Sequence, residues 1–253
     1  MKKPLISIIT ACFNSESTIR DTIDSVLNQT YKNIEYIIID GDSTDKTVSI
    51  IKSYEDNFKN KAIVYKWISE PDKGIYNAIN KGIDLAKGEL IGIIGSDDWY
   101  EKIAIEEIVK SYIKDMPDYI HGNMNIYSKD RQLISTVRPK SKNLMIKRMT
   151  FFHPSSFITK KVYDELKGYS LDYDICSDYD LILKIIKGNY TVKYIDQLIA
   201  NFSVGGISTT RVNKALYESH LIRIQNGYNK WLSFYFYFQA LLTSKIKKLL
   251  NEN

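Results

Sequence analysis

Two adjacent carboxylates, Asp97 and Asp98, closely follow the apolar run 90–94 and are the first residues of this sequence that point to chemistry. Like charges at the end of a buried strand raise each other's pKa unless a cation lies between them. Carboxylate oxygens suit Mg²⁺ or Mn²⁺, which proteins hold with one or two carboxylates together with a substrate phosphate. The other interpretation is an Asp pair that caps a helix beginning near Glu101.

The elements that must position this pair alternate between strand and helix along the first half of the chain. Apolar residues at helical spacing separate the short apolar runs. These runs predict strands at 5–9, 34–39, 62–67 and 90–94. Such alternation is typical of an α/β fold with a mostly parallel sheet and helices on both faces.

Polar residues follow three of these strands, at the point where each strand ends. They occupy segments 10–14, 40–45 and 96–98. Because open α/β sheets bind ligands at the carboxyl ends of their strands, we expect these segments to form one site. Phosphate cradles of the Gly-x-Gly-x-x-Gly and P-loop kinds are missing, and the calcium-loop-like segment 40–45 is followed by Ile51 where such a loop needs its bidentate Glu.

The second half of the chain is less regular. Apolar patterns predict helices at 103–112 and 178–186 and strands at 119–126 and 132–137. No linker or internal repeat interrupts the chain. We therefore expect one catalytic domain over 1–210 and a helical, basic and aromatic tail over 211–253.

Length and composition indicate a globular protein with a substantial core, since 44% of the 253 residues are hydrophobic. No apolar stretch is long enough to span a bilayer, and the N-terminus lacks a signal-type segment. The two cysteines, Cys12 and Cys176, lie far apart and form no metal-ligand spacing. These features predict a reducing, cytoplasmic location.

The C-terminal part of the chain accounts for the whole net charge of +5, because seven basic and two acidic residues follow position 200. Segment 231–242 is densely aromatic, and Lys245, Lys247 and Lys248 come directly after it. Aromatic anchors beside lysines suit a helix on an anionic membrane, although packing on the catalytic domain or a homodimer contact would also bury the aromatics. We expect peripheral membrane contact through 230–250 and no nucleic-acid binding, since no nucleic-acid-binding motif accompanies the lysines.

Several motifs in a fixed order resemble those of family 2 glycosyltransferases with the GT-A fold. The matching blocks are 7–14, 38–47, 69–82, 95–100, 153–154, 167–169, 177–181 and 205–208. The resemblance implies an inverting transferase that uses a nucleotide-sugar donor and a divalent metal, Mn²⁺ or Mg²⁺. The chain departs from the usual motif at Gly95, where similar enzymes have a further Asp or Asn.

The resemblance also assigns residues to the nucleotide. One loop would form a wall of backbone and stacking contacts, and a second would close over the nucleotide with a lysine as counter-charge for phosphate. The residues of these loops are Thr10, Ala11, Phe13 and Asn14, and then Asp72, Lys73, Gly74 and Asn77. Asp40 would accept a hydrogen bond from the base, which favours uracil and hence a UDP-sugar because uracil has a ring N–H donor. Without the resemblance, a credible interpretation of Asp40 is that it begins a turn.

The acidic motifs receive the catalytic roles. By resemblance Asp98 would bind the metal, Asp97 would contact the ribose or a metal-bound water, and Ser96 belongs to the same nucleotide site. Asp178 would be the base that takes the proton from an acceptor hydroxyl as its attack inverts the anomeric carbon. The alternative for Asp178 is a helix N-cap. His153 is as often a packing residue as a functional one and receives no role.

These features predict a hexosyl- or N-acetylhexosaminyltransferase that acts on a hydroxyl of a saccharide or lipid-linked saccharide, in cell-surface polysaccharide synthesis at the inner face of the membrane. Two alternatives stay open. Transfer to a polyprenyl phosphate would need no base, because that acceptor is already ionised. A non-catalytic scaffold that binds nucleotide sugars would not require both Asp98 and Asp178. No residue pattern identifies the donor sugar, the linkage or the oligomeric state.

Overall fold

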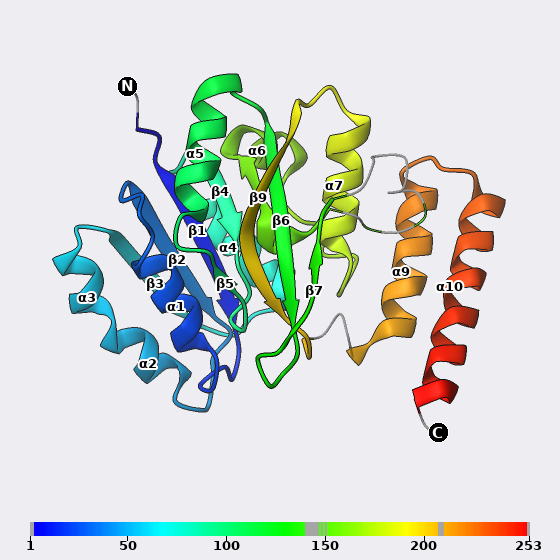
Figure 1. Cartoon of the computed structure of the whole chain (residues 1–253), viewed down its shortest axis with the longest axis horizontal. Coiled ribbons are helices and arrows are strands. Elements are labelled where there is room, and N and C mark those ends of the chain that lie inside the picture. Colours follow the sequence, from blue (N-terminus) through cyan, green and yellow to red (C-terminus); the bar gives the residue numbers. More distant parts are fainter. Residues whose placement is uncertain (1–2, 140–146, 148, 150, 207–209, 252–253) are drawn as a thin grey trace.

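The computed structural model describes residues 3–139, 147, 149, 151–206 and 210–251, without the side chains of 245–251. Strands and helices alternate through the first half, as the apolar spacing predicts (Figure 1). The strands are β1 (Ile6–Cys12), β2 (Ile34–Asp40), β3 (Val64–Ser69), β4 (Leu90–Ile93), β5 (Trp99–Tyr100), β6 (Tyr119–Tyr127), β7 (Leu133–Val137), β8 (Ser156–Thr159) and β9 (Val192–Ser203). The helices are α1 (Ile19–Leu27), α2 (Thr47–Ser53), α3 (Glu55–Asn60), α4 (Ile75–Leu85), α5 (Ala104–Asp115), the 3-10 turn η2 (His153–Ser155), α6 (Lys160–Leu166), α7 (Ser177–Lys187), α9 (Val212–Gln225) and α10 (Lys230–Asn251).

The described strands join one sheet in the order β3-β2-β1-β4-β8-β6-β9-β5, and β7 pairs with β6. The first four strands of this order are parallel, as predicted, whereas β8 runs antiparallel to both of its neighbours. In the parallel register Cys12 is paired with Asp40, and Asp40 with Ser69. The carboxyl ends of β1, β2 and β3 therefore lie next to one another and position the loops that follow them.

The core divides between the two faces of the sheet because successive strand residues point to opposite sides. Ile8 and Ile38 belong to the apolar cluster that includes residues of α1, α2 and α5. Ile9 and Ile39 belong to the cluster that includes residues of α4, α6 and α7. The prediction of helices on both faces is confirmed.

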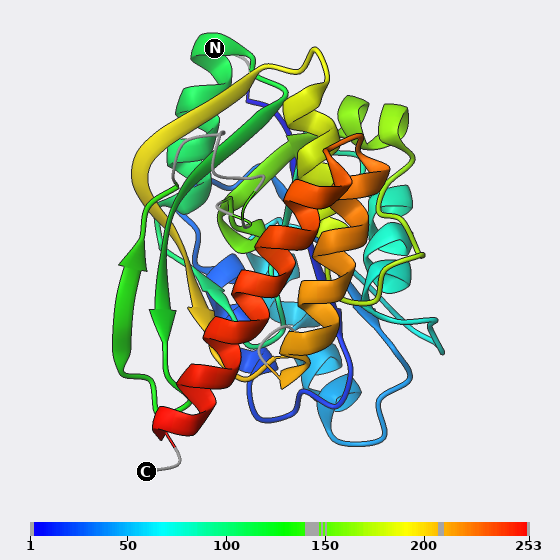
Figure 2. The ribbon, with the colours of Figure 1, turned by 90° about the vertical axis from the view of Figure 1, so that its right-hand side faces the viewer.

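The two C-terminal helices lie side by side, with α10 outermost, as Figures 1 and 2 show. Ile222 of α9 is fully buried in the same apolar cluster as Leu183 of α7. Helix α9 is thus part of the packed core, and the division of the chain at residue 210 stays a prediction. Among the described residues, no helix combines the length and apolar character needed to cross a bilayer.

Candidate active site

The loops after β1, β2 and β4 are tied together by hydrogen bonds. The backbone N–H of Asn14 donates to Ser43 Oγ over 2.8 Å, and the N–H of Thr44 donates to Asn14 Oδ1 over 2.9 Å. Ser15 Oγ lies 2.9 Å from Ser96 Oγ, which links the first loop to the loop that carries the acid pair. The three polar segments therefore meet, as their positions after parallel strands predict.

The residues at the end of β1 and in the loop after it that are predicted to line the nucleotide differ in accessibility. Phe13 is 59% exposed, so its ring is accessible to a stacked base. Thr10 is fully buried, with its hydroxyl 3.0 Å from that of Tyr36, and Ala11 is buried as well. The side chains of Thr10 and Ala11 thus belong to the core, and only their backbone could approach a ligand.

Asp40 is fully buried, and protein donors already occupy its carboxylate. Ser43 donates to it from both the backbone N–H and the hydroxyl, and Ser69 Oγ donates to Oδ2 over 2.7 Å. The Cys12 thiol lies 3.6 Å from Oδ1. Because a carboxylate has about four acceptor positions, a base N–H can bond Asp40 only by replacing one of these donors.

An open acceptor lies beside the turn that follows β2. Asp72 Oδ1 accepts from the N–H of Gly74 over 2.7 Å, and Asp72 Oδ2 lies 2.5 Å from the point that a Cβ at Gly41 would take. Glycine at 41 leaves room for this oxygen, to which the described residues supply no donor. The N–H of Lys73 donates to Asn77 Oδ1 over 3.1 Å, and the exposed Lys73 ammonium has no acidic partner among the described residues.

Asp97 and Asp98 converge on Gly95. A Cβ at Gly95 would lie 2.8 Å from Asp98 Oδ2 and 3.0 Å from Asp97 Oδ1, so the glycine gives both carboxylates their room. Asp98 is buried, and its Oδ1 accepts from the N–H of Ser203 at the end of β9 over 2.9 Å. Gly206 borders the other side, since a Cβ there would lie 3.8 Å from Asp97 Oδ2. Ile207 and Ser208 of the same motif lie outside the described residues.

The electrostatics of this pair fit a divalent cation. Burial raises the pKa of Asp97, and burial together with the charge of Asp97 raises the pKa of Asp98 well above its usual range. Convergent carboxylates that resist joint ionisation are a suitable donor set for Mg²⁺ or Mn²⁺. No group of three or more His, Cys, Asp or Glu residues with metal-binding geometry occurs in the described part of the chain. The other ligands of an ion would be substrate phosphate and water.

An arginine that the sequence motifs do not single out lies beside the pair. Arg131, in the turn between β6 and β7, has its guanidinium carbon 4.2 Å from the centre of the Trp99 ring and forms an ion pair with Asp21 of α1. Its charge lowers the pKa of Asp97, against the larger effect of burial. No local spacing could have identified Arg131, because only the folding of the β6–β7 hairpin brings it to the site.

Asp178 lies in the first turn of α7, whose N-cap is Cys176. Two neighbouring residues donate to it, the N–H of Tyr179 at 2.8 Å and the hydroxyl of Tyr76 at 3.2 Å, and both meet Oδ1. Its own backbone N–H is a further donor to the carboxylate. Neither Tyr179 nor Tyr76 donates to Oδ2. Burial raises the pKa of Asp178 to about 6. A carboxylate with a pKa just below neutrality is suited to accept a proton.

Three nearby residues with reactive side chains are held in inert forms. His153 Nε2 lies 2.7 Å from the Tyr169 hydroxyl, and burial lowers the pKa of His153 to about 4, so the ring is neutral at pH 7. Burial raises the pKa of the Cys176 thiol to about 12, and burial with the charge of Asp40 raises that of Cys12 further. Neither thiol is a ready nucleophile.

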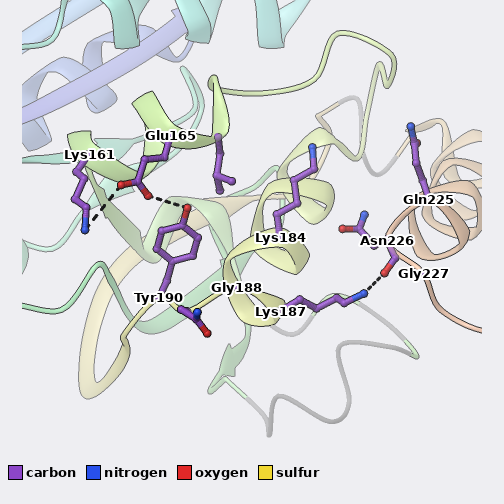
Figure 3. A pocket seen from close by; sticks show the side chains of 11 residues that line it. Lys161, Glu165, Lys184, Lys187, Gly188, Tyr190, Gln225, Asn226 and Gly227 are labelled. Carbon is purple, nitrogen blue, oxygen red and sulfur yellow. Dashed lines mark hydrogen bonds and ion pairs between the residues drawn. The ribbon is translucent and has the colours of Figure 1, made fainter.

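A separate open pocket lies between α6, α7 and α9 (Figure 3). Its lysines have partners, since Lys184 pairs with Asp180 at 2.7 Å, Lys161 approaches Glu165 at 3.9 Å, and Lys187 donates to a backbone carbonyl after α9. None of the predicted site residues lines it. The lining residues are Lys161, Glu165, Leu166, Lys184, Lys187, Gly188, Asn189, Tyr190, Gln225, Asn226 and Gly227.

The sheet, whose first four strands are parallel and whose two faces are covered by helices, is the GT-A fold of glycosyltransferases. The chain belongs to glycosyl transferase family 2, whose family model matches residues 7–168. It is 27% identical over 218 residues to a PGL/p-HBAD biosynthesis glycosyltransferase of Mycobacterium bovis, covering 85% of this chain and 83% of that protein. It is also 27% identical over 233 residues to the chondroitin synthase of Pasteurella multocida, covering 90% of this chain but only 23% of the synthase.

Solved structures share the fold at low sequence identity. The mannosyltransferase PcManGT from Pyrobaculum calidifontis, in complex with GDP-Man and Mn²⁺, matches with a TM-score of 0.71 and 16% identity over 97% of this chain and 76% of that one. S. aureus TarS 1-349, in complex with UDP-GlcNAc, matches with a TM-score of 0.68 and 15% identity over 94% of this chain and 71% of that one. The match to the longer TarS chain covers 43% of it.

Proposed function

We propose that the protein is a metal-dependent, inverting glycosyltransferase. It moves a hexose or N-acetylhexosamine from a UDP-sugar to a hydroxyl of a saccharide or lipid-linked saccharide, in the synthesis of a cell-surface polysaccharide or glycolipid. The observation that carries this proposal is Asp178, whose Oδ1 accepts from Tyr179 and Tyr76, whose Oδ2 accepts from neither, and whose pKa is about 6. The similarity to a PGL/p-HBAD biosynthesis glycosyltransferase and to a chondroitin synthase supports this class of enzyme.

The donor site would use the loops at the carboxyl edge of the sheet. The exposed ring of Phe13 offers a stacking surface for the base, and Asp72 Oδ2 offers an open acceptor beside Asp40. The solved complexes contain both UDP-GlcNAc and GDP-Man, so the fold alone does not select the nucleotide. The ring N–H of uracil can donate to Asp72, or to Asp40 in place of a serine hydroxyl. Guanine has a ring N–H as well, so UDP is distinguished from GDP by the titration described below. Lys73, exposed near the start of α4, is the candidate counter-charge for the diphosphate.

Asp97 and Asp98 are the residues that would hold Mn²⁺ or Mg²⁺. A bound divalent ion would neutralise the charge that develops on the diphosphate as the sugar bond breaks. The guanidinium of Arg131, whose charge lowers the pKa of Asp97, adds a fixed positive charge beside the acid pair. The protein's own contribution here is to keep the two carboxylates converged over Gly95.

The chemical step places a proton on Asp178. The acceptor oxygen forms a bond to the anomeric carbon while the bond from that carbon to the diphosphate oxygen breaks with its electron pair. The hydroxyl proton moves to Asp178 Oδ2, and attack from the far side inverts the anomeric centre. With a pKa of about 6, Asp178 is mostly ionised at pH 7 and still basic enough to take the proton.

Helix α10 is the element that would hold the enzyme at the cytoplasmic face of the membrane. Exposed side chains at helical spacing form the α10 stripe, and Trp231 is 72% exposed. Its members are Trp231, Phe234, Tyr235, Phe238 and Leu242. The helix contains four lysines and no acidic residue, which complements an anionic lipid surface. Figure 2 shows α10 as the outermost helix on its side of the molecule.

Calorimetric titration with UDP and with GDP, each with and without Mn²⁺, tests the donor site without an acceptor. We expect UDP to bind in the presence of Mn²⁺, and GDP to bind at least about tenfold more weakly. Metal-independent binding would contradict the role of Asp98, and preference for GDP would contradict a UDP-sugar. No binding of either nucleotide would contradict the proposed donor site and with it the transferase.

A further inference from the structure

The segment that carries Asp178 is held along its length by one face of α9. Residues of this helix and its C-terminal end contact positions 173–180. The contacting residues are Lys214, Ala215, Glu218, Ser219, Gln225 and Asn226. Helix α9, which the sequence analysis assigns to the tail, therefore stabilises the loop that precedes the proposed base.

Glu218 makes the central contact of this face. It is 5% exposed, and its Oε2 accepts from the N–H groups of Ile175 at 2.9 Å and Cys176 at 3.0 Å. Its Oε1 accepts from the N–H of Asp174 at 3.1 Å. Three successive backbone donors that lead into α7 thus bond one buried carboxylate, which also suits the positive end of the helix dipole.

Tyr76 holds the same segment from the opposite side. Its hydroxyl lies 2.6 Å from the carbonyl oxygen of Ile175 and 3.2 Å from Asp178 Oδ1. The residue is 7% exposed, and its ring stacks on Tyr169 with the ring centres 5.4 Å apart. The N–H of Ile175 is therefore bonded by α9 and its carbonyl by α4.

We propose that Glu218 and Tyr76 are positioning residues that clamp the Ile175 backbone and thereby orient Asp178 for proton transfer. The inference rests on the proposed role of Asp178 as base. Glu218 touches neither the donor loops nor Asp178 directly, so it acts through the backbone. Tyr76 shares its one hydroxyl proton between the Ile175 carbonyl and Asp178 Oδ1, so it acts on the backbone and on the carboxylate, and Oδ2 is the oxygen that Tyr76 leaves to receive the transferred proton.

The two clamp residues have opposite electrostatic effects on the base. The Glu218 carboxylate raises the pKa of Asp178, whereas the hydrogen bond from Tyr76 lowers it. The other titratable groups that interact with Asp178 are neutral near pH 6, because a thiol and a phenol have ordinary pKa values well above 6 and burial raises the pKa of each further. These groups are Cys176, Tyr169 and Tyr119.

The test is the pH profile of sugar transfer by Tyr76→Phe and Glu218→Gln, measured with the full chain. We expect kcat to fall about tenfold in each variant while the affinity for UDP with Mn²⁺ stays unchanged. The acidic limb of the profile is the range in which kcat falls as the pH is lowered. Its midpoint should rise by about half a pH unit in Tyr76→Phe and fall by about half a unit in Glu218→Gln. General loosening of the fold would not move the two limbs in opposite directions.

Matched controls remove the same groups elsewhere. Tyr163→Phe deletes a buried hydroxyl that bonds Tyr169, and Glu165→Gln removes an α6 carboxylate that bonds Tyr190. Both control variants should keep the wild-type kcat and the wild-type midpoint of the acidic limb. If Tyr76→Phe and Glu218→Gln behave like these controls while Asp178→Asn is inactive, the clamp proposal is wrong and the proposed function stands. An active Asp178→Asn would instead overturn the base assignment and the clamp with it. Melting curves with UDP and Mn²⁺ show that each variant is folded.

Discussion

The hydroxyl of Tyr76 on α4 lies 3.2 Å from Oδ1 of Asp178 on α7, although 102 positions separate the two residues. Tyr76 follows directly on the segment from Asp72 to Gly74 that lies beside the proposed nucleotide site. The contact therefore joins the donor side of the site to the carboxylate that we propose as its base.

Transfer activity should depend on the ionisation of Asp178. Because its pKa is raised to about 6, we expect kcat to fall tenfold per pH unit below about pH 6 and to level off above about pH 7. Asp178→Asn should lose far more than about tenfold in kcat and keep its affinity for UDP. An Asp178→Asn enzyme within tenfold of wild type would contradict the base role and favour an acceptor that is already ionised, such as a polyprenyl phosphate.

The same carboxylate should cost stability at neutral pH. Its folded-state pKa of about 6 exceeds the unfolded value, so the ionised form destabilises the fold above pH 6, and this penalty disappears below about pH 4. We expect Asp178→Asn to raise the free energy of unfolding by about 2 kcal/mol at pH 8 and to change it little at pH 4. Urea titrations at the two pH values measure this difference. Equal effects at both values would argue against a raised pKa.

We expect Asp40 to have a structural role and Asp72 to bind the ligand. Asp40→Asn places an amide where four donors converge, so we expect a loss of about 2 kcal/mol in unfolding free energy. Asp72→Asn leaves the core unchanged and should weaken UDP binding about tenfold. Calorimetry on both variants, with melting curves, decides between them. A folded, stable Asp40→Asn protein with impaired UDP binding would restore Asp40 as the acceptor for the base.

Metal binding should depend on the acid pair. UDP with Mn²⁺ should raise the melting temperature of the wild type by about 5 °C at saturating ligand, and Asp98→Asn should abolish the Mn²⁺-dependent part of this shift. Asp164→Asn is the matched control, because Asp164 lies on α6 and pairs with Lys160. A Mn²⁺-dependent shift that survives in Asp98→Asn would place the ion elsewhere.

The α10 stripe should bind anionic lipid. The double variant Phe234→Ser, Phe238→Ser should reduce sedimentation with phosphatidylglycerol vesicles by more than about tenfold, since two aromatic anchors are lost. Ile113→Ser, at an exposed position of α5, is the control and should bind as the wild type does. Retained vesicle binding would contradict the membrane role. A concentration-dependent dimer that the double variant dissociates would identify a second copy of the chain as the partner.

Local patterns in the sequence were enough to predict much of the fold. Apolar spacing depends only on neighbouring residues, and it located the four parallel strands and the helices between them. The third strand begins two residues later than predicted, because Ala62 adopts a positive φ of 54° in a turn. Strands β5, β8 and β9 were missed because they are short or carry no sustained apolar pattern.

The sequence by itself determined the family, the two-faced α/β sheet and the acidic motifs that end at its carboxyl edge. Only the tertiary structure decided which acids are open to a ligand. Asp40 accepts from donors of three segments, whereas the neighbours Tyr76 and Tyr179 bond Asp178 at Oδ1 alone. These differences arise from contacts between residues far apart in the chain. Burial and hydrogen bonding set by such contacts control whether a carboxylate supports the fold or takes part in chemistry.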